Sequence, residues 1–388
     1  MDHLFYELIQ VALGNRSELS HIPSKKEWEE LFQMSVKQSL IGINFAALKQ
    51  LAKRQQTENL PKSLKMQWLG LVVRIQKRNE YMDEKCIEVQ KLLSDMGFRT
   101  SILKGQGLAL LYGANLCTLR QSGDIDIWLD GGMGRAYTFC KERFGIFDFD
   151  YINAHAPFYD NVEVELHWRV HSLPNPCMNK KIQRWFEKHK QLMFQEKKIE
   201  NQGGLIVTPH VEFNLFFVML HCYHHMFESG LGLRQLMDYY FVLCSMPKEY
   251  NFEKVITNIK AFGMERFAKG VMWIILNVFV GVEVSKVEVS KDDSLETCNY
   301  NPKIELRSIC EPDEHEGKFL LKEIMAGGNF GHFDERKKKI NNKVLAPFVE
   351  RLQHNWHLAS RYPKEFFWAP VWLVWHFVWK RIWLIRNN

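Results

Sequence analysis

The chain has 388 residues, of which 46% are hydrophobic and 25% are charged. These proportions are typical of globular proteins, which excludes a disordered or fibrous chain, and the length suffices for two or three domains. The 51 basic residues exceed the 45 acidic residues and give a net charge of +6, which favours a polyanionic partner such as a nucleotide without requiring one.

Cellular location is inferred from the cysteines and from apolar runs. None of the eight cysteines lies at the two-residue spacing of zinc ribbons or redox motifs, and the N-terminus lacks the features of a secretory signal. We therefore expect free thiols and a reducing, cytoplasmic setting. The apolar run Phe366–Trp379 has 14 residues, fewer than the ~20 that a spanning helix needs, so we expect no transmembrane segment.

Residues 1–96 are predicted to form an N-terminal helical region. Ser24, three residues before Glu27, is a candidate helix cap. From Leu64 to Met96 apolar residues recur at helical spacing, which predicts one long helix that ends at Gly97.

Residues 97–175 are predicted to form an α+β core with a small mixed β-sheet. Strands are expected at 98–103, 124–129, 147–153 and 161–170, and helices at 105–111 and 135–144. Residues 176–388 are predicted to form a C-terminal helical region. Its helices are expected at 209–227, 231–243, 252–280, 337–360 and 368–385, with an aperiodic surface excursion at 283–312.

Two of the predicted strands alternate between acidic and aliphatic residues. Asp124 and Asp126 lie on one strand face, which we expect to face solvent, while the isoleucines between and after them face the core. Glu163, Glu165 and His167 share one face of the later strand in the same way. Carboxylates held together repel unless a cation bridges them, and Mg²⁺ or Mn²⁺ prefers such oxygen ligands. The same alternation is also typical of a half-exposed strand, and spacing alone leaves both interpretations open.

Several short motifs follow one another along the chain. They are Leu103-Lys104-Gly105, Tyr112, Arg120, Gly123-Asp124-Ile125-Asp126 and Glu165-Leu166-His167-Trp168, then His221, His224, Arg234, Asp238 and the segment 327–331. Together they resemble the uncharacterised nucleotidyltransferase family of the DNA polymerase beta-like superfamily. The resemblance is closest over residues 98–170 and looser beyond them.

The resemblance implies transfer of a nucleoside monophosphate from a nucleoside triphosphate such as ATP, with release of pyrophosphate. Asp124, Asp126 and Glu165 would hold Mg²⁺ or Mn²⁺, and Glu163 competes with Glu165 for the third place. The acceptor is not identified and is a small molecule, an RNA or a protein. The alternative function is a catalytically weak or inactive nucleotide-binding or regulatory module on the same fold.

Phosphate binding departs from the pattern of the superfamily. Members usually carry a glycine-serine pair at a helix start, whereas this chain has Lys104 and Gly105. Lys104 is expected to meet phosphate as a point charge, or to lie in solvent. Arg120 either clamps phosphate or pairs with a local carboxylate.

The remaining motifs are interpreted as structural. His221, His224 and His225 are expected on a polar helix face and not as a zinc site, because further zinc ligands are missing. Arg234 and Asp238, four residues apart, are expected to form an ion pair. Residues 327–331 are expected to form a tight turn.

The C-terminal tryptophans recur every three or four residues, from Trp368 to Trp383, and basic residues follow them. This stripe suits an interfacial helix on a membrane, or a helix packed on its own protein or on a partner. We favour packing on protein.

Overall fold

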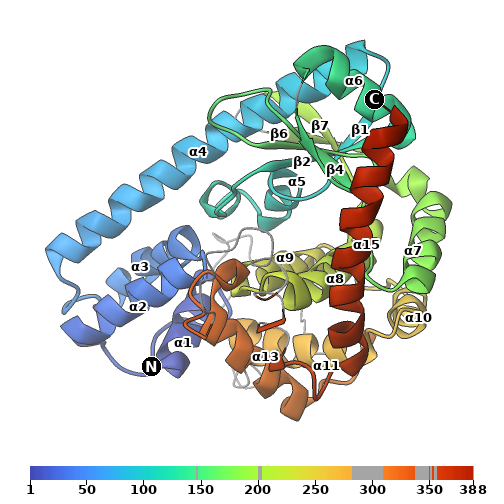
Figure 1. Cartoon of the computed structure of the whole chain (residues 1–388). Helices are drawn as coiled ribbons and strands as arrows, with labels where there is room; N and C mark the ends of the chain where they lie inside the picture. The colour runs from blue at the N-terminus through green and yellow to red at the C-terminus, as the bar shows by residue number, and fades with distance from the viewer. Residues whose placement is uncertain are drawn as a thin grey trace.

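The computed structural model describes residues 1–145, 147–199, 203–281, 309–336, 349, 352–353 and 356–387. The expected excursion at 283–312 and the expected helix at 337–360 lie mostly outside these residues. The predicted α+β class is confirmed, because the described residues form many helices, one mixed five-stranded sheet and a two-stranded sheet (Figure 1).

The N-terminal helices are α1 (Asp2–Ala12), α2 (Lys25–Lys37) and α3 (Ile41–Lys53). The cap predicted at Ser24 is confirmed. Ser24 Oγ accepts the backbone N–H of Glu27, and the Glu27 carboxylate accepts the backbone N–H of Ser24. This reciprocal pairing satisfies two backbone donors that a helix start otherwise leaves without partners.

The predicted long helix is α4 (Lys62–Asp95), which crosses the molecule diagonally in Figure 1. Gly97 follows it with φ +78°, a left-handed conformation that favours glycine. The two halves of α4 enter different hydrophobic clusters. Trp68 and Val72 in its first half belong to a hydrophobic cluster formed mostly by helices, which we call the helical cluster. Met82 and Val89 in its second half belong to a hydrophobic cluster around the β-sheet, which we call the sheet cluster.

The five-stranded sheet has the order β1-β2-β5-β4-β3. Its strands are β1 (Arg99–Ile102), β2 (Ile125–Asp130), β3 (Asp148–Phe149), β4 (Asn153–Ala156) and β5 (Val164–His167). Strand β2 runs parallel to β5 and the other pairs are antiparallel, so the sheet is mixed as predicted.

One strand prediction was wrong. The strand expected at 147–153 ends at Phe149, and a separate strand, β4, begins at Asn153. The reason is a turn that the Asp150 carboxylate organises by accepting the backbone N–H groups of Ile152 and Asn153.

Short helices connect the strands. These are α5 (Gln106–Ala109), η1 (Leu110–Tyr112), η2 (Cys117–Leu119) and α6 (Gly132–Phe144). Helix α6 and the second half of α4 share the sheet cluster with Ile125, Ile127 and Leu129 of β2. The other face of β2 contributes Trp128 to the helical cluster, so both faces of this strand are covered.

The region after residue 175 is not helical throughout. Between α7 (Pro176–Lys188), η3 (Lys190–Met193) and the later helices lies a hairpin of β6 (Gln195–Ile199) and β7 (Gly204–Thr208), which corrects the prediction of an all-helical region. The hairpin is held by α4, because the Gln90 side chain both donates to the Val207 carbonyl and accepts its N–H.

The later helices complete the helical cluster. They are α8 (Val211–Glu228), α9 (Leu233–Cys244), α10 (Glu253–Ala261), α11 (Glu265–Ile274), the π-helix η4 (Ile275–Val280), α13 (Glu314–Gly327), η6 (Asn329–Gly331) and α15 (Pro363–Asn387). The helix expected at 252–280 is broken around Gly263, whose φ is +71°. Gln10 and Asn15 bind carbonyls of residues 277–279, so the two predicted helical regions share one core.

Helix α15 runs from the helical part to the sheet part (Figure 1). Glu365 near its start accepts the Tyr223 hydroxyl of α8, and Lys380 near its end pairs with Asp148 at 2.8 Å. Among the helices that the structure describes, none combines the length and apolar character needed to cross a membrane.

A buried ion pair joins the loop before β2 to α9. Arg120 donates from Nε to Asp238 Oδ1 at 2.7 Å and from Nη2 to Oδ2 at 2.8 Å, and both side chains are nearly inaccessible. The Tyr112 hydroxyl donates to the same carboxylate at 2.6 Å. Breaking such a pair leaves one buried charge without its partner, which is costly.

We predict that Arg120→Ala lowers the free energy of unfolding by about 3 to 5 kcal/mol, because Asp238 then keeps a buried charge. Urea denaturation monitored by circular dichroism measures this. Lys318→Ala is the control, since the Lys318–Glu314 pair is exposed and its loss should cost less than about 1 kcal/mol. Equal losses in the two variants would contradict the assignment.

Candidate active site

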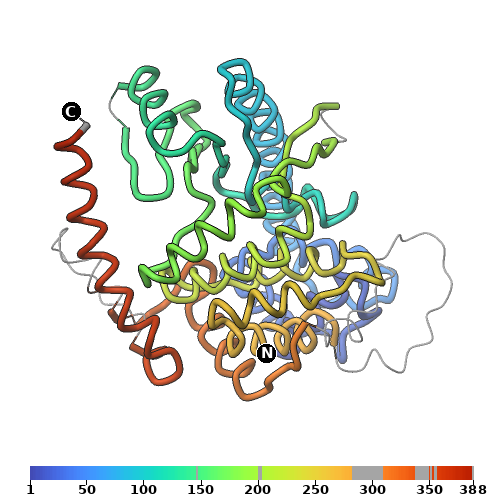
Figure 2. The backbone as a smooth tube through the Cα atoms, turned by 90° about the vertical axis from the view of Figure 1, so that its right-hand side faces the viewer, coloured from blue at the N-terminus to red at the C-terminus, as the bar shows by residue number. Residues whose placement is uncertain are grey.

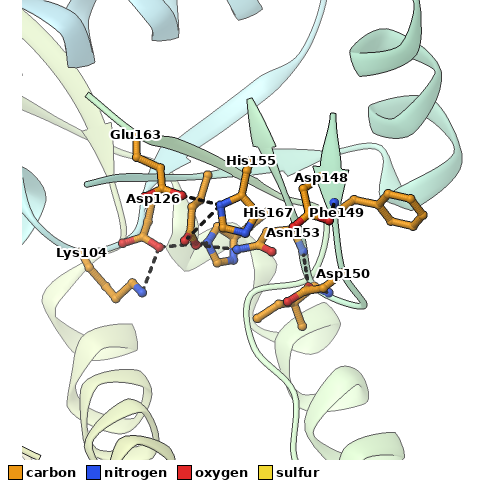
Figure 3. A network of polar contacts seen from close by, with 11 residues as sticks. Lys104, Asp126, Asp148, Phe149, Asp150, Asn153, His155, Glu163 and His167 are labelled. Carbon is orange, nitrogen blue, oxygen red and sulfur yellow. Dashed lines mark hydrogen bonds and ion pairs between the residues drawn. The ribbon is translucent and has the colours of Figure 1, made fainter. Parts of the chain in front are cut away.

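The predicted acidic residues gather where β2 and β5 run side by side. In the parallel register Asp126 lies opposite Glu165, and Asp124 lies one residue before β2. Figure 3 shows Asp126 with Lys104 and His167 beside it. Glu163 lies one residue before β5. The parallel pairing therefore brings Asp126 and Glu165 to the same level of the sheet, on the face that carries Trp128 into the helical cluster.

Asp126 is buried and lies between two cationic groups. Lys104 Nζ donates to Asp126 Oδ1 at 2.9 Å, and His167 Nε2 contacts the same oxygen at 2.9 Å. The expectation that Asp126 faces solvent was wrong, because only 3% of its side chain is exposed. The helices that the sequence places far from β2 cover this face of the sheet.

His167 connects the two strands electrostatically. Its Nε2 also lies 3.1 Å from Glu165 Oε2. Burial alone would lower the pKa of His167, but hydrogen bonds to Asp126 and Glu165 raise it to about 9. A protonated His167 would donate from Nε2 to both carboxylates, whereas its Nδ1 is buried without a hydrogen-bond partner.

The carboxylates of Asp126 and Glu165 stay ionised. Burial opposes ionisation, but Lys104 and His167 hold the pKa of Asp126 below its ordinary value. The pKa of Glu165 is also lowered against the effect of burial, chiefly by the hydrogen bond from His167. Asn153 of β4 donates a further hydrogen bond to Glu165 Oε2.

Asp124 responds to the charge beside it. The negative charge of Asp126, together with burial, raises the pKa of Asp124 to about 6. Such a shift marks a site where like charges are crowded, and a bound cation relieves this repulsion.

Glu163 lies apart from Asp126. Its side chain is 58% exposed and binds His155 Nδ1, whereas the Glu165 side chain is 19% exposed and contacts the same histidine, His167, as Asp126 does. The geometry therefore places Glu165, and not Glu163, beside Asp126.

Two groups of side chains in the described part of the chain have the proximity that a metal ion requires. In Asp126, Glu165 and His167, the ligand atoms lie within 4.8 Å of one another, and the same holds for His155, Glu163 and Glu165. Carboxylate oxygens suit Mg²⁺ and Mn²⁺, and an imidazole ligand favours Mn²⁺ over Mg²⁺. The first group fits a divalent cation, provided that His167 releases its proton or moves aside.

The backbone after β1 directs Lys104 toward the carboxylates. The Leu103 N–H donates to the Asp126 carbonyl at 2.9 Å, and Gly105 adopts φ +55° next to the carbonyl of Asp124. The left-handed turn at Gly105 begins α5, which has only four residues and thus a small dipole. The Lys104 ammonium is the main positive charge that this segment brings to the site.

The partners of Arg120 and Arg234 come from distant parts of the chain. Arg120 pairs with a carboxylate, as one of its two expected roles required, but this carboxylate is Asp238 and not a local one. The expected Arg234–Asp238 pair is replaced by this one, and Arg234 Nη1 donates instead to the Gln121 carbonyl at 3.2 Å. Arg234 Nε is buried without a hydrogen-bond partner.

The histidines of α8 form a cluster with His171. Ring centroids are 4.5 Å apart for His171 and His224, and 4.3 Å apart for His221 and His225. Burial, followed by nearby positive charges including Lys104, lowers the pKa values of His171 and His221. Neither metal-compatible group of the described residues includes these histidines.

We predict that low pH destabilises the fold partly through His225. Burial, together with the charge of His224, lowers its pKa to about 3; Lys104 and Arg234 act in the same direction, and Glu228 opposes them. The unfolded chain takes up a proton near pH 6.5 and the folded chain does not, so stability falls as pH drops below 6.5.

Urea denaturation of the wild type and of His225→Gln, which retains a polar side chain, measures this effect. Between pH 7 and pH 5 the wild type should lose about 1 to 2 kcal/mol more than the variant. Identical pH profiles of the two proteins would show that His225 does not carry the effect.

Sequence reasoning missed three residues of the site. The alternation with Glu165 places His167 on the acidic face of its strand, but the sequence pattern gives this histidine no role. Asn153 was assigned to the end of the wrong strand, and Arg234 was assigned to an ion pair. No local pattern distinguishes these last two residues, because their neighbours at the site come from other parts of the chain.

Comparison with protein families gave a match. Neither the curated proteins nor the solved structures compared with the chain gave a match. Residues 24–279, well over half of the chain, match the family described as uncharacterised nucleotidyltransferase. The match includes the sheet, its carboxylates and helices α8 and α9. The chain therefore belongs to the uncharacterised nucleotidyltransferase family.

Proposed function

We propose that the protein is a metal-dependent nucleotidyltransferase that moves a nucleoside monophosphate from a nucleoside triphosphate to an acceptor. The observation that carries the proposal is the proximity of Asp126, Glu165 and His167, whose ligand atoms lie within 4.8 Å of one another on parallel strands. Membership of the family supports the same class of reaction.

Asp126 and Glu165 would hold Mg²⁺ or Mn²⁺ together with Asp124, which directly precedes β2 and lies outside the group of Asp126, Glu165 and His167. When bound, such an ion neutralises charge on the triphosphate and activates the acceptor oxygen. The acceptor oxygen forms a bond to the α-phosphorus while the bond from that phosphorus to pyrophosphate breaks. Glu165 would take the proton that the acceptor hydroxyl loses.

The phosphates require positive charge, and Lys104 and Arg234 supply it. Lys104 has 20% of its side chain exposed and lies beside Asp126. Arg234 occupies the first turn of α9, where the helix dipole disfavours a cation, and burial and the charge of Arg120 lower its pKa further. A phosphate near Arg234 would offset both costs and use its unpartnered Nε.

A second candidate function is a catalytically weak or inactive nucleotide-binding module. The observation that favours it is that Lys104 and His167 already contact Asp126 Oδ1, so a metal ion competes with two internal cations. Metal dependence separates the two functions. An enzyme binds nucleotide together with Mg²⁺ or Mn²⁺, whereas an inactive module binds it equally well in EDTA.

We predict that Asp126→Asn and Glu165→Gln each reduce transfer by at least about a hundredfold, because each removes a ligand charge at the metal. Asp124→Asn should have a comparable effect. Transfer is measured by incubating the protein with each labelled nucleoside triphosphate and a cell extract, then identifying which molecule carries the label.

The control for Glu165→Gln is Glu163→Gln, the same change two residues earlier on an exposed side chain. It should retain most of the activity, apart from a small effect through the local field. Circular dichroism must show folded protein in every variant, because Asp126 is buried. Full transfer by Asp126→Asn and Glu165→Gln would rule out this site.

We predict that Lys104→Ala and Arg234→Ala each weaken nucleotide binding roughly tenfold to a hundredfold, since a charge-assisted hydrogen bond contributes ~1.5 to 3 kcal/mol. Titration calorimetry with a non-hydrolysable nucleoside triphosphate measures this. Arg135→Ala serves as control, because Arg135 is exposed on α6 and donates to the Gly97 carbonyl away from the site. Unchanged affinity in Arg234→Ala would remove Arg234 from the phosphate site.

A further inference from the structure

Helix α15 has two different faces. Its inner face packs on the sheet part of the protein: the rings of Trp372, Trp375 and Trp379 lie 5.2 to 5.3 Å from the Tyr151 ring, and Trp383 lies 4.2 Å from Tyr137. The tryptophan stripe therefore packs on its own protein, which is one of the interpretations that the sequence analysis favoured.

The opposite face of α15 is apolar and exposed. Six residues at helical spacing form what we call the outer stripe, with exposed fractions from 41% for Val371 to 80% for Ile385. The outer stripe consists of Phe367, Val371, Val374, Val378, Ile382 and Ile385. Helix α15 stands at the outer edge of the molecule in Figure 2. A continuous apolar surface of this kind marks an interaction site.

The exposed charged residues of α15 itself are basic. Lys364, Arg381 and Arg386 are exposed, and Arg381 lies over the ring of Phe377, which is itself 52% exposed. The acidic residue of α15, Glu365, faces inward and binds the Tyr223 hydroxyl. On α15, the exposed charges beside the outer stripe are therefore positive, and the carboxylate of Glu365 faces inward.

The apolar outer stripe and the basic residues of α15 together indicate the chemistry of the partner. We infer that the outer stripe docks on the surface of an anionic lipid bilayer, with its apolar side chains below the headgroups and its arginines beside the phosphates. A second copy of the chain fits less well, because pairing two such faces would set basic residues against basic residues. Helix α15 lies on the bilayer and does not span it, since its inner face remains packed on protein.

The dimensions agree with a peripheral contact. Helix α15 has 25 residues and is about 37 Å long at ~1.5 Å per residue, and the outer stripe extends along most of it. Glu365 and Lys380 anchor the helix at both ends, so the stripe is presented on a fixed support. The contact would hold the nucleotidyltransferase site near the membrane, and it does not depend on whether that site is active.

Co-sedimentation of the full-length protein with vesicles tests this inference. Protein should pellet with vesicles of phosphatidylcholine and phosphatidylserine, less with phosphatidylcholine alone, and less at high salt. Val374→Glu and Val378→Glu should each reduce vesicle binding at least tenfold, because each places a negative charge in the outer stripe. Arg381→Gln should reduce binding roughly fivefold and only on anionic vesicles.

Met66→Glu is the matched control, because Met66 on α4 is 65% exposed and lies outside the outer stripe. It should bind vesicles as the wild type does. Unchanged melting curves would show that the α15 variants are folded. Absence of protein from every vesicle pellet would overturn the inference. So would a dimer in light scattering that Val378→Glu converts to monomer while vesicle binding is absent.

Discussion

The buried charge of Asp126 is the constraint on which the site depends. A carboxylate without water needs opposite charge close by, and two different segments supply it: Lys104 after β1, and His167 at the end of β5. These contacts fix the relative positions of three strand ends. They also leave Asp124 as the carboxyl group whose charge is least compensated, and its pKa rises to about 6 for that reason. The site is thus held together by the same electrostatic balance that a metal ion would alter.

The sequence pattern predicted those features of the structure that depend on neighbouring residues in the sequence. Alternation along β2 and β5 correctly separated the acidic face from the aliphatic face, and the family motif favoured Glu165 over Glu163, a choice that the register of Asp126 with Glu165 supports. The cap at Ser24 and the end of α4 at Gly97 were predictable because each depends on neighbouring residues.

Contacts between distant segments were not predictable. Arg120 pairs with Asp238, which lies 118 residues later in the sequence. The spacing of four residues predicted Arg234 as the partner of Asp238 instead. The helical cluster covers the acidic face and buries Asp126. The alternation of residues along a strand does not indicate such covering. The β6–β7 hairpin was not predicted, because its strands are short and the side chain that holds it by hydrogen bonds is Gln90 of α4, more than a hundred residues earlier. In each case the deciding partner lies outside any window of sequence.

The division of α4 between two hydrophobic clusters limits how this molecule can move. Trp68 is fixed among the N-terminal helices and Val89 is fixed under the sheet, with continuous helix between them. The sheet cannot swing away from the helices unless α4 bends or one cluster loses its packing, and α15 restrains the opposite side through Glu365 and Lys380. Opening by a hinge between two rigid bodies is therefore disfavoured. A nucleotide proposed for the site would therefore have to be exchanged over a frame that stays nearly still.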